Sequence, residues 1–196
     1  MTDRCGAVSR KTNETSMELE LNLDGRGRFT GTTGIGFLDH MLQLMAMHGG
    51  LDMDLSCQGD IEVDNHHLVE DLGIVMGKAL NKALGDKRGI ARYALAYTPM
   101  DESLVMVCVD ISGRPYLHYN LPLTREYVGQ LETEMVEEFF RAFTMNSKIT
   151  LHINLMYGTN NHHMIEALFK GMGRALKEAV YIKDAAAGVM STKGSL

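Results

Sequence analysis

A fifteen-residue run that occurs twice constrains this chain more than any other feature of its sequence. HHLVEDLGIVMGKAL begins at His66, and HHMIEALFKGMGRAL begins at His162, 96 residues further on. The two runs share eight of their fifteen residues, including both histidines and the glutamate. We predict a helix over each run, over residues 66–84 and from His162 to about residue 181. The repeat therefore predicts a duplicated fold with an equivalent helix in each half.

Each run opens with two histidines and a glutamate that a helix places close together at one end. His66 and Glu70 are four residues apart, and His67 and Glu70 are three apart, so their side chains lie on adjacent faces. The second run repeats this spacing with His162, His163 and Glu166. Imidazole and carboxylate are ligands that Mn, Fe, Co and Zn prefer, and histidines about 100° apart can bind two different ions. The alternative, a polar helix start exposed to water, is disfavoured by the repetition.

The positive end of the helix dipole does not attract a cation, so further ligands are expected from elsewhere in the chain. His40 lies 11 residues before Leu51, and Glu138 lies 11 residues before Ile149, each on the helix that precedes a paired-histidine helix. The duplication makes the two positions equivalent and favours both as metal ligands. Without it, His40 would be interpreted as an ordinary surface or core histidine and Glu138 as part of a solvated face.

The remaining histidines lack this support from the duplication. His48 ends the helix that carries His40, and we predict for it a contact with substrate or with a metal ligand. His118 and His152 are interpreted as structural or surface residues.

The composition of the chain excludes several classes of function. Its 196 residues carry a net charge of -6, and no block of Lys and Arg is dense enough to follow a nucleic-acid backbone. No stretch approaches the roughly 18 apolar residues of a membrane span, and the first fifteen residues have no apolar segment typical of an export signal. Cys5, Cys57 and Cys108 are widely spaced and form no CxxC motif, which is typical of reduced thiols. We predict a soluble cytoplasmic protein with a small-molecule partner and no nucleic-acid or membrane partner.

Each half of the chain shows the pattern strand, strand, helix, strand, helix. In the first half these elements are predicted at residues 4–10, 17–23, 37–47, 51–57 and 66–84. In the second half they are predicted at residues 104–111, 116–121, 133–145, 149–155 and 162–181, with the first two strands forming a hairpin. We predict an α+β fold of two fused, pseudo-symmetric ββαβα halves, 1–90 and 91–196. The halves are expected to form one compact unit with sheet on one side and helices on the other.

Five phrases along the chain resemble a known family. They are TGIGFLDHML, DNHHLVEDLGI, SGRPYL, TNNHHMIEALFK and STKG, in this order. Together they resemble the imidazoleglycerol-phosphate dehydratases, metal-dependent lyases of histidine biosynthesis, over nearly the whole chain. The resemblance implies dehydration of D-erythro-imidazoleglycerol 3-phosphate to imidazole-acetol phosphate. It also implies a homo-oligomeric shell of 24 subunits with active sites between subunits.

The resemblance implies two Mn²⁺ ions in each active site. Their ligands would be His40, His66, His67, Glu70, Glu138, His162, His163 and Glu166. Glu138 is a departure, because the plant members of the family carry a histidine there, although a carboxylate is itself a competent manganese ligand. Leu44 is a second departure, since other members carry a glutamine at this position, in the phrase DHMLDQ.

Residues that engage the substrate can also be matched to the family. The substrate-binding positions are Glu14, His48, Arg92, Arg114, Lys170, Ser191 and Lys193, most of them directed at the phosphate. A phosphate dianion needs several charge-assisted donors, and arginine offers it a planar fork. The catalytic positions are Glu14, Asp101, Glu70 and Glu166, of which Glu14 and Asp101 match acidic residues near the reacting carbons.

The reaction implied by the resemblance depends on the substrate's imidazole ring. Both ring nitrogens bind metal, which favours a metal-bound imidazolate. The electron-rich ring helps to expel the hydroxyl on the adjacent carbon, Glu14 removes the proton from the next carbon, and the resulting enol tautomerises. Two alternatives stay open at this point: a dinuclear metallohydrolase acting on a phosphate ester, and a non-catalytic metal-binding shell.

Overall fold

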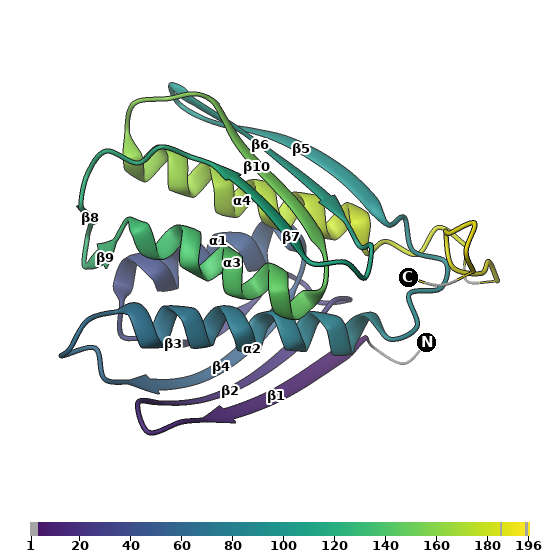
Figure 1. Cartoon of the computed structure of the whole chain (residues 1–196), viewed down its shortest axis with the longest axis horizontal. Helices are drawn as coiled ribbons and strands as arrows, with labels where there is room; N and C mark the ends of the chain where they lie inside the picture. The colour runs from purple at the N-terminus through teal and green to yellow at the C-terminus, as the bar shows by residue number, and fades with distance from the viewer. Residues whose placement is uncertain (1–3, 185, 195) are drawn as a thin grey trace.

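Two four-stranded sheets enclose four helices in the computed structural model, which describes residues 4–184, 186–194 and 196 (Figure 1). The first sheet has the order β1-β2-β4-β3 and consists of β1 (Cys5–Lys11), β2 (Thr15–Asn22), β3 (Phe29–Thr32) and β4 (Asp52–Gly59). The second has the order β5-β6-β10-β7 and consists of β5 (Tyr93–Met100), β6 (Ser103–Asp110), β7 (Tyr116–Asn120) and β10 (Thr150–Tyr157). A small ribbon is formed by β8 (Tyr127–Val128) and β9 (Leu131–Glu132). The helices are α1 (Gly36–Gly49), α2 (His66–Leu84), α3 (Glu134–Ser147) and α4 (Asn161–Ala179).

The helices lie in the middle of the molecule, between the two sheets (Figure 1). Helix α2 packs on β1 and β2, and α4 packs on β5 and β6. Across the middle, α2 packs on α3 and α1 packs on α4, so each helix pair joins the two halves. The predicted α+β class is confirmed. The expected arrangement of the whole unit, with sheet on one side and helices on the other, was wrong, because the chain has a sheet on each outer side and the helices lie between them. In the whole chain the two helical faces bury each other, because each still exposes apolar side chains after covering its own sheet.

Two glycines inside the paired-histidine helices allow the helices to cross closely. A Cβ atom on Gly77 of α2 would lie 2.5 Å from the carbonyl oxygen of Phe143 in α3. A Cβ atom on Gly173 of α4 would lie 2.5 Å from the carbonyl oxygen of Met45 in α1. Gly77 and Gly173 are the same position of the repeated run, so the duplicated sequence makes the same helix contact twice.

Replacing Gly173 with alanine should lower the free energy of unfolding by about 1–3 kcal/mol, as expected when extra volume is forced into a packed contact. The loss should appear although alanine is intrinsically the better helix former by about 1 kcal/mol. Urea unfolding of the metal-free protein at a fixed chain concentration measures it. Gly36 is the matched control, since a Cβ added there meets nothing within 4 Å. Equal stability of the two variants would contradict the close-crossing account.

Several strand assignments differ from the sequence-based ones, including the short strands β8 and β9, which were not predicted. Strand β5 was missed because its pattern is inverted: small alanines face α4, while Tyr93, Leu95 and Tyr97 point outward. The short strand β3 was also missed, and it pairs in parallel with β4. The predicted hairpin between residues 104–111 and 116–121 was wrong, because β7 pairs in parallel with β10. Both edges of β6 are already occupied, by β5 and β10.

The predicted boundary near residue 90 falls in the connection between α2 and β5. Among the described residues, no helix combines the length and the apolar composition required to cross a lipid bilayer.

Candidate metal and substrate sites

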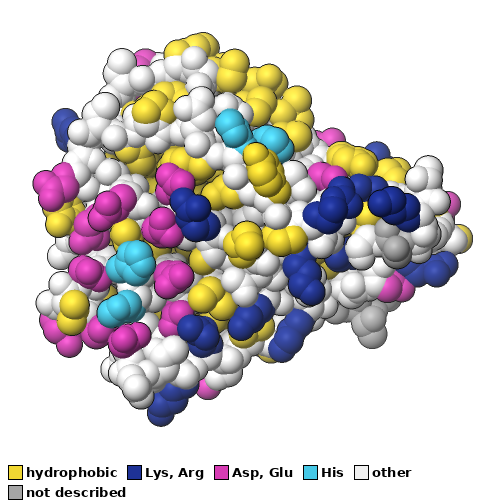
Figure 2. Space-filling model, in the orientation of Figure 1, with side chains coloured by type: hydrophobic (Ala, Val, Ile, Leu, Met, Phe, Trp, Pro, Cys, Tyr) yellow, Lys and Arg dark blue, Asp and Glu magenta, His cyan; other side chains and the backbone are white. Residues whose placement is uncertain are grey.

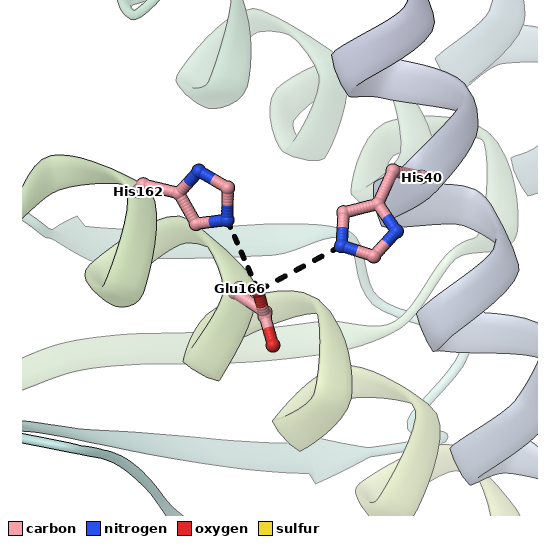
Figure 3. Close-up of side chains that lie close together, drawn as sticks. All are labelled: His40, His162 and Glu166. Atoms are coloured by element: carbon pink, nitrogen blue, oxygen red, sulfur yellow. Dashed lines mark hydrogen bonds and ion pairs between the residues drawn. The ribbon is translucent and has the colours of Figure 1, made fainter.

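Three predicted metal ligands from the two halves of the chain meet where α1 crosses α4 (Figure 3). His40 comes from α1, and His162 and Glu166 come from the first turns of α4. The Nε2 atom of His162 lies 3.1 Å from Glu166 Oε2, and the Nε2 atom of His40 lies 3.7 Å from the same oxygen. Each residue offers one ligand atom, and the three atoms lie within 4.8 Å of one another. Two imidazole nitrogens and a carboxylate oxygen at this spacing can bind one divalent transition metal.

The carboxylate of Glu166 is held ionised by its neighbours. The residue is buried, which opposes its ionisation, but an ion pair with Lys170 Nζ and the bond to His162 outweigh this and lower its pKa. His48, at the other end of α1, has a lowered pKa because of burial and the nearby cations of Lys170 and Arg174. A neutral His48 and an ionised Glu166 are the forms that bind metal or accept hydrogen bonds.

The equivalent crossing of α2 and α3 places Glu138 opposite the first paired-histidine helix. His40 lies five residues before Met45, and Glu138 lies five residues before Phe143, the two residues that contact the repeated glycines. In this structure, Glu138 Oε2 lies 3.4 Å from Arg141 Nε, within its own helix. Among the residues that the structure describes, the His40 group is the one set of three potential ligands already within 4.8 Å. The equivalent residues around Glu138 therefore have the same helix crossing as the His40 group, but their side chains do not converge in this structure.

The second histidine of each pair is bonded to a carboxylate from outside its helix. His67 Nδ1 lies 3.1 Å from Asp60 Oδ2, and His163 Nδ1 lies 2.6 Å from Glu102 Oε2. These hydrogen bonds raise the pKa of both imidazoles. In both cases Nε2 is left on the opposite side of the ring, and for His163 it lies 3.8 Å from Asp101 Oδ2. The sequence analysis missed Asp60 and Glu102, because isolated loop carboxylates form no pattern along the chain.

The predicted acidic residues Glu14 and Asp101 occupy the turns of the two hairpins that flank the histidine pairs. Glu14 lies between β1 and β2, where its charge helps to raise the pKa of His67. Asp101 lies between β5 and β6, beside His163. The first turn is fixed to α2 by buried Asp71, which accepts hydrogen bonds from Thr15 Oγ1 and, at 2.8 Å, from Arg10 Nε. The position of Glu14 relative to the histidine helix is therefore set by a charged network that the sequence analysis did not identify.

A basic hollow lies at the other end of the molecule, beneath the C-terminal segment. Its volume is about 660 Å³, and it is lined by Arg92, Tyr93, Arg114, Met190, Ser191, Thr192 and Lys193. Arg92 is buried and has a φ of 72°, which is rare for a side-chain-bearing residue. Its Nε donates to Asp110 Oδ1 at 2.7 Å, and Nη1 donates to the Met190 carbonyl at 2.6 Å. The hydrogen bond to Asp110 raises the pKa of Arg92 and fixes the guanidinium at the wall of the hollow.

The histidine cluster and the basic hollow occupy opposite ends of α4. His162 and Glu166 belong to its first turns, whereas the amide of Arg92 donates to the carbonyl of Ala179, the last residue of the helix. A helix of 19 residues is about 28 Å long. On the face drawn in Figure 2, most acidic side chains lie toward the left together with some of the histidines, and the densest group of lysines and arginines lies at the right.

The structure thus arranges the predicted residues into separate groups. His40, His162 and Glu166 form a cluster with Lys170, whereas Arg92, Arg114, Ser191 and Lys193 surround the hollow. His66, His67, Glu70 and Glu14 lie around the start of α2, and Asp101 lies beside His163. His118 and His152 pair across β7 and β10 and belong to none of these groups.

The comparisons with known proteins identify the family. The family model for imidazoleglycerol-phosphate dehydratase matches residues 33–176, well over half of the chain. The chain belongs to the imidazoleglycerol-phosphate dehydratase family. The predicted family, enzyme class of hydro-lyase and place in histidine biosynthesis are confirmed.

Similar sequences and structures carry the same family name over the full length. An imidazoleglycerol-phosphate dehydratase of Heliobacterium modesticaldum is 61% identical over 194 residues, which are 98% of this chain and 100% of the relative. One of Oceanobacillus iheyensis is 57% identical over 193 residues, which are 98% of this chain and 100% of the relative. The crystal structure of the Staphylococcus aureus dehydratase superposes with a TM-score of 0.83 at 44% identity, covering 91% of this chain and 99% of that one. That of the Pyrococcus furiosus dehydratase, in complex with (S)-C348, gives 0.82 at 35% identity, covering 96% and 100%.

Proposed function

We propose that this dehydratase acts in the cytoplasm on imidazoleglycerol phosphate at a site that holds two Mn²⁺ ions and is shared between copies of the chain. The product is imidazole-acetol phosphate. The observation that carries the proposal is the convergence of His40, His162 and Glu166, from both halves of the chain, on one point. The cytoplasmic assignment follows from the widely spaced cysteines and from the biosynthetic family.

The ligand chemistry of this cluster fits Mn²⁺. Two imidazole Nε2 atoms and one ionised carboxylate lie within 4.8 Å of one another, and each is on a rigid helix. The second set would consist of His66, Glu70 and Glu138, related to the first by the duplicated helix crossing. Bound at these sets, the two ions would supply Lewis-acid stabilisation of negative charge on the substrate's imidazole ring. His67 and His163, whose Nδ1 atoms are bonded to Asp60 and Glu102, would use their Nε2 atoms to complete sites with a neighbouring copy.

Other side chains of the protein would bind the substrate's phosphate and transfer the proton. Arg92, Arg114, Ser191 and Lys193 would hold the phosphate by charge-assisted and hydroxyl hydrogen bonds. Glu14 would remove the proton from the carbon that bears the hydroxyl retained in the product as a ketone, while the hydroxyl next to the ring leaves as water. Asp101, beside His163, would face the same carbons from the second hairpin.

The distance along α4 supports an active site built from more than one copy. A three-carbon chain joins the imidazole and the phosphate of the substrate, so they are separated by roughly 7 Å. The histidine cluster and the hollow are at opposite ends of a helix about 28 Å long, so one substrate molecule cannot contact both on the same chain. The exposed tyrosines and leucine on the outer face of β5 offer an apolar surface for a second copy. The 24-subunit shell implied by the family would bring the two ends together.

An assay of chelator-stripped protein tests the proposal. With imidazoleglycerol phosphate as substrate, added Mn²⁺ should restore formation of the ketone product, without release of inorganic phosphate. Phosphate release would instead support the metallohydrolase alternative. Metal uptake without any turnover would support the non-catalytic shell and contradict the proposal.

Replacing Lys193 with alanine should raise KM by roughly tenfold or more, because one charge-assisted bond to the phosphate is lost. Metal content should stay at the wild-type level, since Lys193 lies in the basic hollow and not in the histidine cluster. Steady-state kinetics and metal analysis measure the two effects. Lys183→Ala, an exposed neighbour outside the hollow, is the control. An equal loss of metal and of substrate binding would refute the phosphate-binding role.

Acidification should release the metal as the pH falls below about 6–6.5, near the unperturbed imidazole pKa. Hydrogen bonds to carboxylates raise the pKa of His67 and His163, so for these ligands the competition between proton and metal begins at a higher pH. The stability of the metal-free fold should depend on pH in the opposite direction. The ion pairs of His67 with Asp60 and of His163 with Glu102 stabilise the fold below pH 6.5, and this contribution is lost as the pH rises through the raised pKa values of the two histidines. Metal analysis and sedimentation across pH 5–8 measure both. Metal and assembly retained at pH 5 would contradict metal-linked contacts between copies.

A further inference from the structure

Glu102, which the family resemblance did not single out, makes two kinds of contact with its two oxygens. Its Oε1 accepts hydrogen bonds from the amide of Asn160 at 2.8 Å, the amide of Thr159 at 3.2 Å and the hydroxyl of Ser103 at 2.9 Å. Its Oε2 accepts from His163 Nδ1 at 2.6 Å. One oxygen is therefore committed to the loop that leads into α4, and the other to the imidazole of a paired histidine.

The bond from His163 selects which ring nitrogen is available. A neutral imidazole carries one N–H, so a ring that donates from Nδ1 has its lone pair on Nε2. A carboxylate that accepts the first nitrogen's proton also fixes the plane of the ring. The Nε2 atom of His163 is directed toward the side of Asp101, away from Glu102.

The same bond is made in the other half of the chain by a residue that is not the equivalent of Glu102. The pairing register centres the β1–β2 turn on residues 13 and 14 and the β5–β6 turn on residues 101 and 102, which places Glu14 and Glu102 at equivalent positions. In the first half, however, the carboxylate on His67 Nδ1 is Asp60, from the segment between β4 and α2. Two non-equivalent carboxylates thus produce the same geometry on the two equivalent histidines. A bond left over from the duplication alone would have come from equivalent residues.

We infer that Glu102 is a positioning residue for metal binding, which holds His163 in the tautomer whose Nε2 binds a divalent cation. The inference rests on the proposed function, because it takes His163 as a ligand. It also assigns different roles to two equivalent carboxylates: Glu14 acts on the substrate, and Glu102 acts on a metal ligand. Asp60 has the corresponding role for His67.

The substitution Glu102→Gln separates positioning from simple support of the loop. The four donors around Oε1, which include the hydroxyl of Thr159 at 3.4 Å, require an oxygen there. A glutamine therefore keeps its Oε1 in that place and turns its NH₂ group toward His163. The NH₂ group donates to Nδ1, which moves the ring proton to Nε2 and blocks the metal-binding nitrogen. The backbone contacts of the loop are preserved.

We expect Glu102→Gln to weaken Mn²⁺ binding at one of the two sites by about 10–100-fold, the usual effect of losing such a partner. The unfolding midpoint of the metal-free protein should remain near that of wild type. Titration calorimetry of chelator-stripped protein with Mn²⁺ alone measures the affinity, and thermal unfolding measures the stability. Glu178→Gln, an exposed carboxylate near the far end of α4, is the control and should bind Mn²⁺ as wild type does.

Wild-type affinity in Glu102→Gln would overturn the inference and leave Glu102 as a support of the loop. Loss of metal accompanied by a large drop in the unfolding midpoint would also count against it. In that event the two substitutions are combined. If Glu102 acts through His163, adding Glu102→Gln to His163→Ala should not weaken Mn²⁺ binding further, and an additive loss of affinity would refute this action. If wild-type protein itself binds no Mn²⁺, the proposed function fails, which is a distinguishable result.

Discussion

Replacing Glu166 with glutamine should reduce turnover to near background and weaken Mn²⁺ binding at the His40 cluster by about 100-fold or more. Glutamine cannot supply the charged oxygen on which His40 and His162 converge. It also leaves the mostly buried ammonium of Lys170 without its counter-ion. Removing one partner of a buried ion pair costs up to about 3–5 kcal/mol, and the partial exposure of Lys170 places the expected loss nearer 1–2 kcal/mol.

Metal analysis, steady-state kinetics and thermal unfolding measure these three effects together. Glu178→Gln is the matched control, because Glu178 is an exposed carboxylate near the far end of the same helix. The stability loss also has a pH signature. Because the pKa of Glu166 is lowered, its contribution is present above the ordinary glutamate pKa and is lost as the pH falls through the lowered value. Full metal content in Glu166→Gln would contradict the assignment of the cluster.

Replacing Glu14 with glutamine should lower kcat by about 10²–10⁴-fold, the range expected for loss of a general base. Metal content and unfolding temperature should not change, since Glu14 is exposed in the β1–β2 turn and the turn is held by Thr12, Thr15 and Asp71. The change in kcat should exceed any change in KM, because a general base acts on the substrate as it passes through the transition state and contributes little to substrate binding.

Single-turnover kinetics with metal-loaded protein give the cleanest measurement of this effect. Glu18→Gln, an exposed glutamate on the adjoining strand β2, is the control and should retain wild-type turnover. A variant Glu14→Gln with wild-type kcat would exclude Glu14 as the base. Asp101, in the equivalent hairpin of the second half, would then be the next carboxylate to test.

The repeat predicted most of what is organised around the paired histidines. Helix α2 begins at His66 as predicted, and α4 begins one residue before His162. The equivalence of His40 and Glu138, inferred from a spacing of 11 residues, agrees with the two helix crossings at Gly77 and Gly173. The repeat allows this prediction because a contact present in both halves of the fold requires similar residues at the same spacing in both halves of the sequence.

Features without periodicity could not be predicted in this way. Asp71, Glu102 and Asp110 act through contacts with residues distant in the sequence, and Asp60 acts from the loop that precedes α2. The local sequence of all four resembles that of ordinary loop, helix or strand-end carboxylates. Strand β5 was missed because its large side chains face outward, a pattern that depends on what covers the sheet. Arg92 and Arg114 were found only through the family resemblance, since isolated basic residues are usually solvated.

The separation between the two ends of α4 could be foreseen only in part from the sequence. Its predicted length already implied that His162 and the segment around Arg92 would be far apart if both contacted the same helix. Only the fold shows that they do, through the bond between Arg92 and Ala179. The separation of the histidine cluster from the basic hollow, on which the proposal of a site shared between copies rests, is thus a tertiary property.

Anomalous diffraction from crystals of the Mn²⁺-loaded protein, recorded at the manganese absorption edge, tests the central claim most directly. The account predicts two peaks per chain. One should be bound by His40 Nε2, His162 Nε2 and Glu166, and the other should lie where His66, Glu70 and Glu138 converge. A single peak per chain, or a second peak remote from Glu138, would contradict the account of two metal sites built from a duplicated helix crossing.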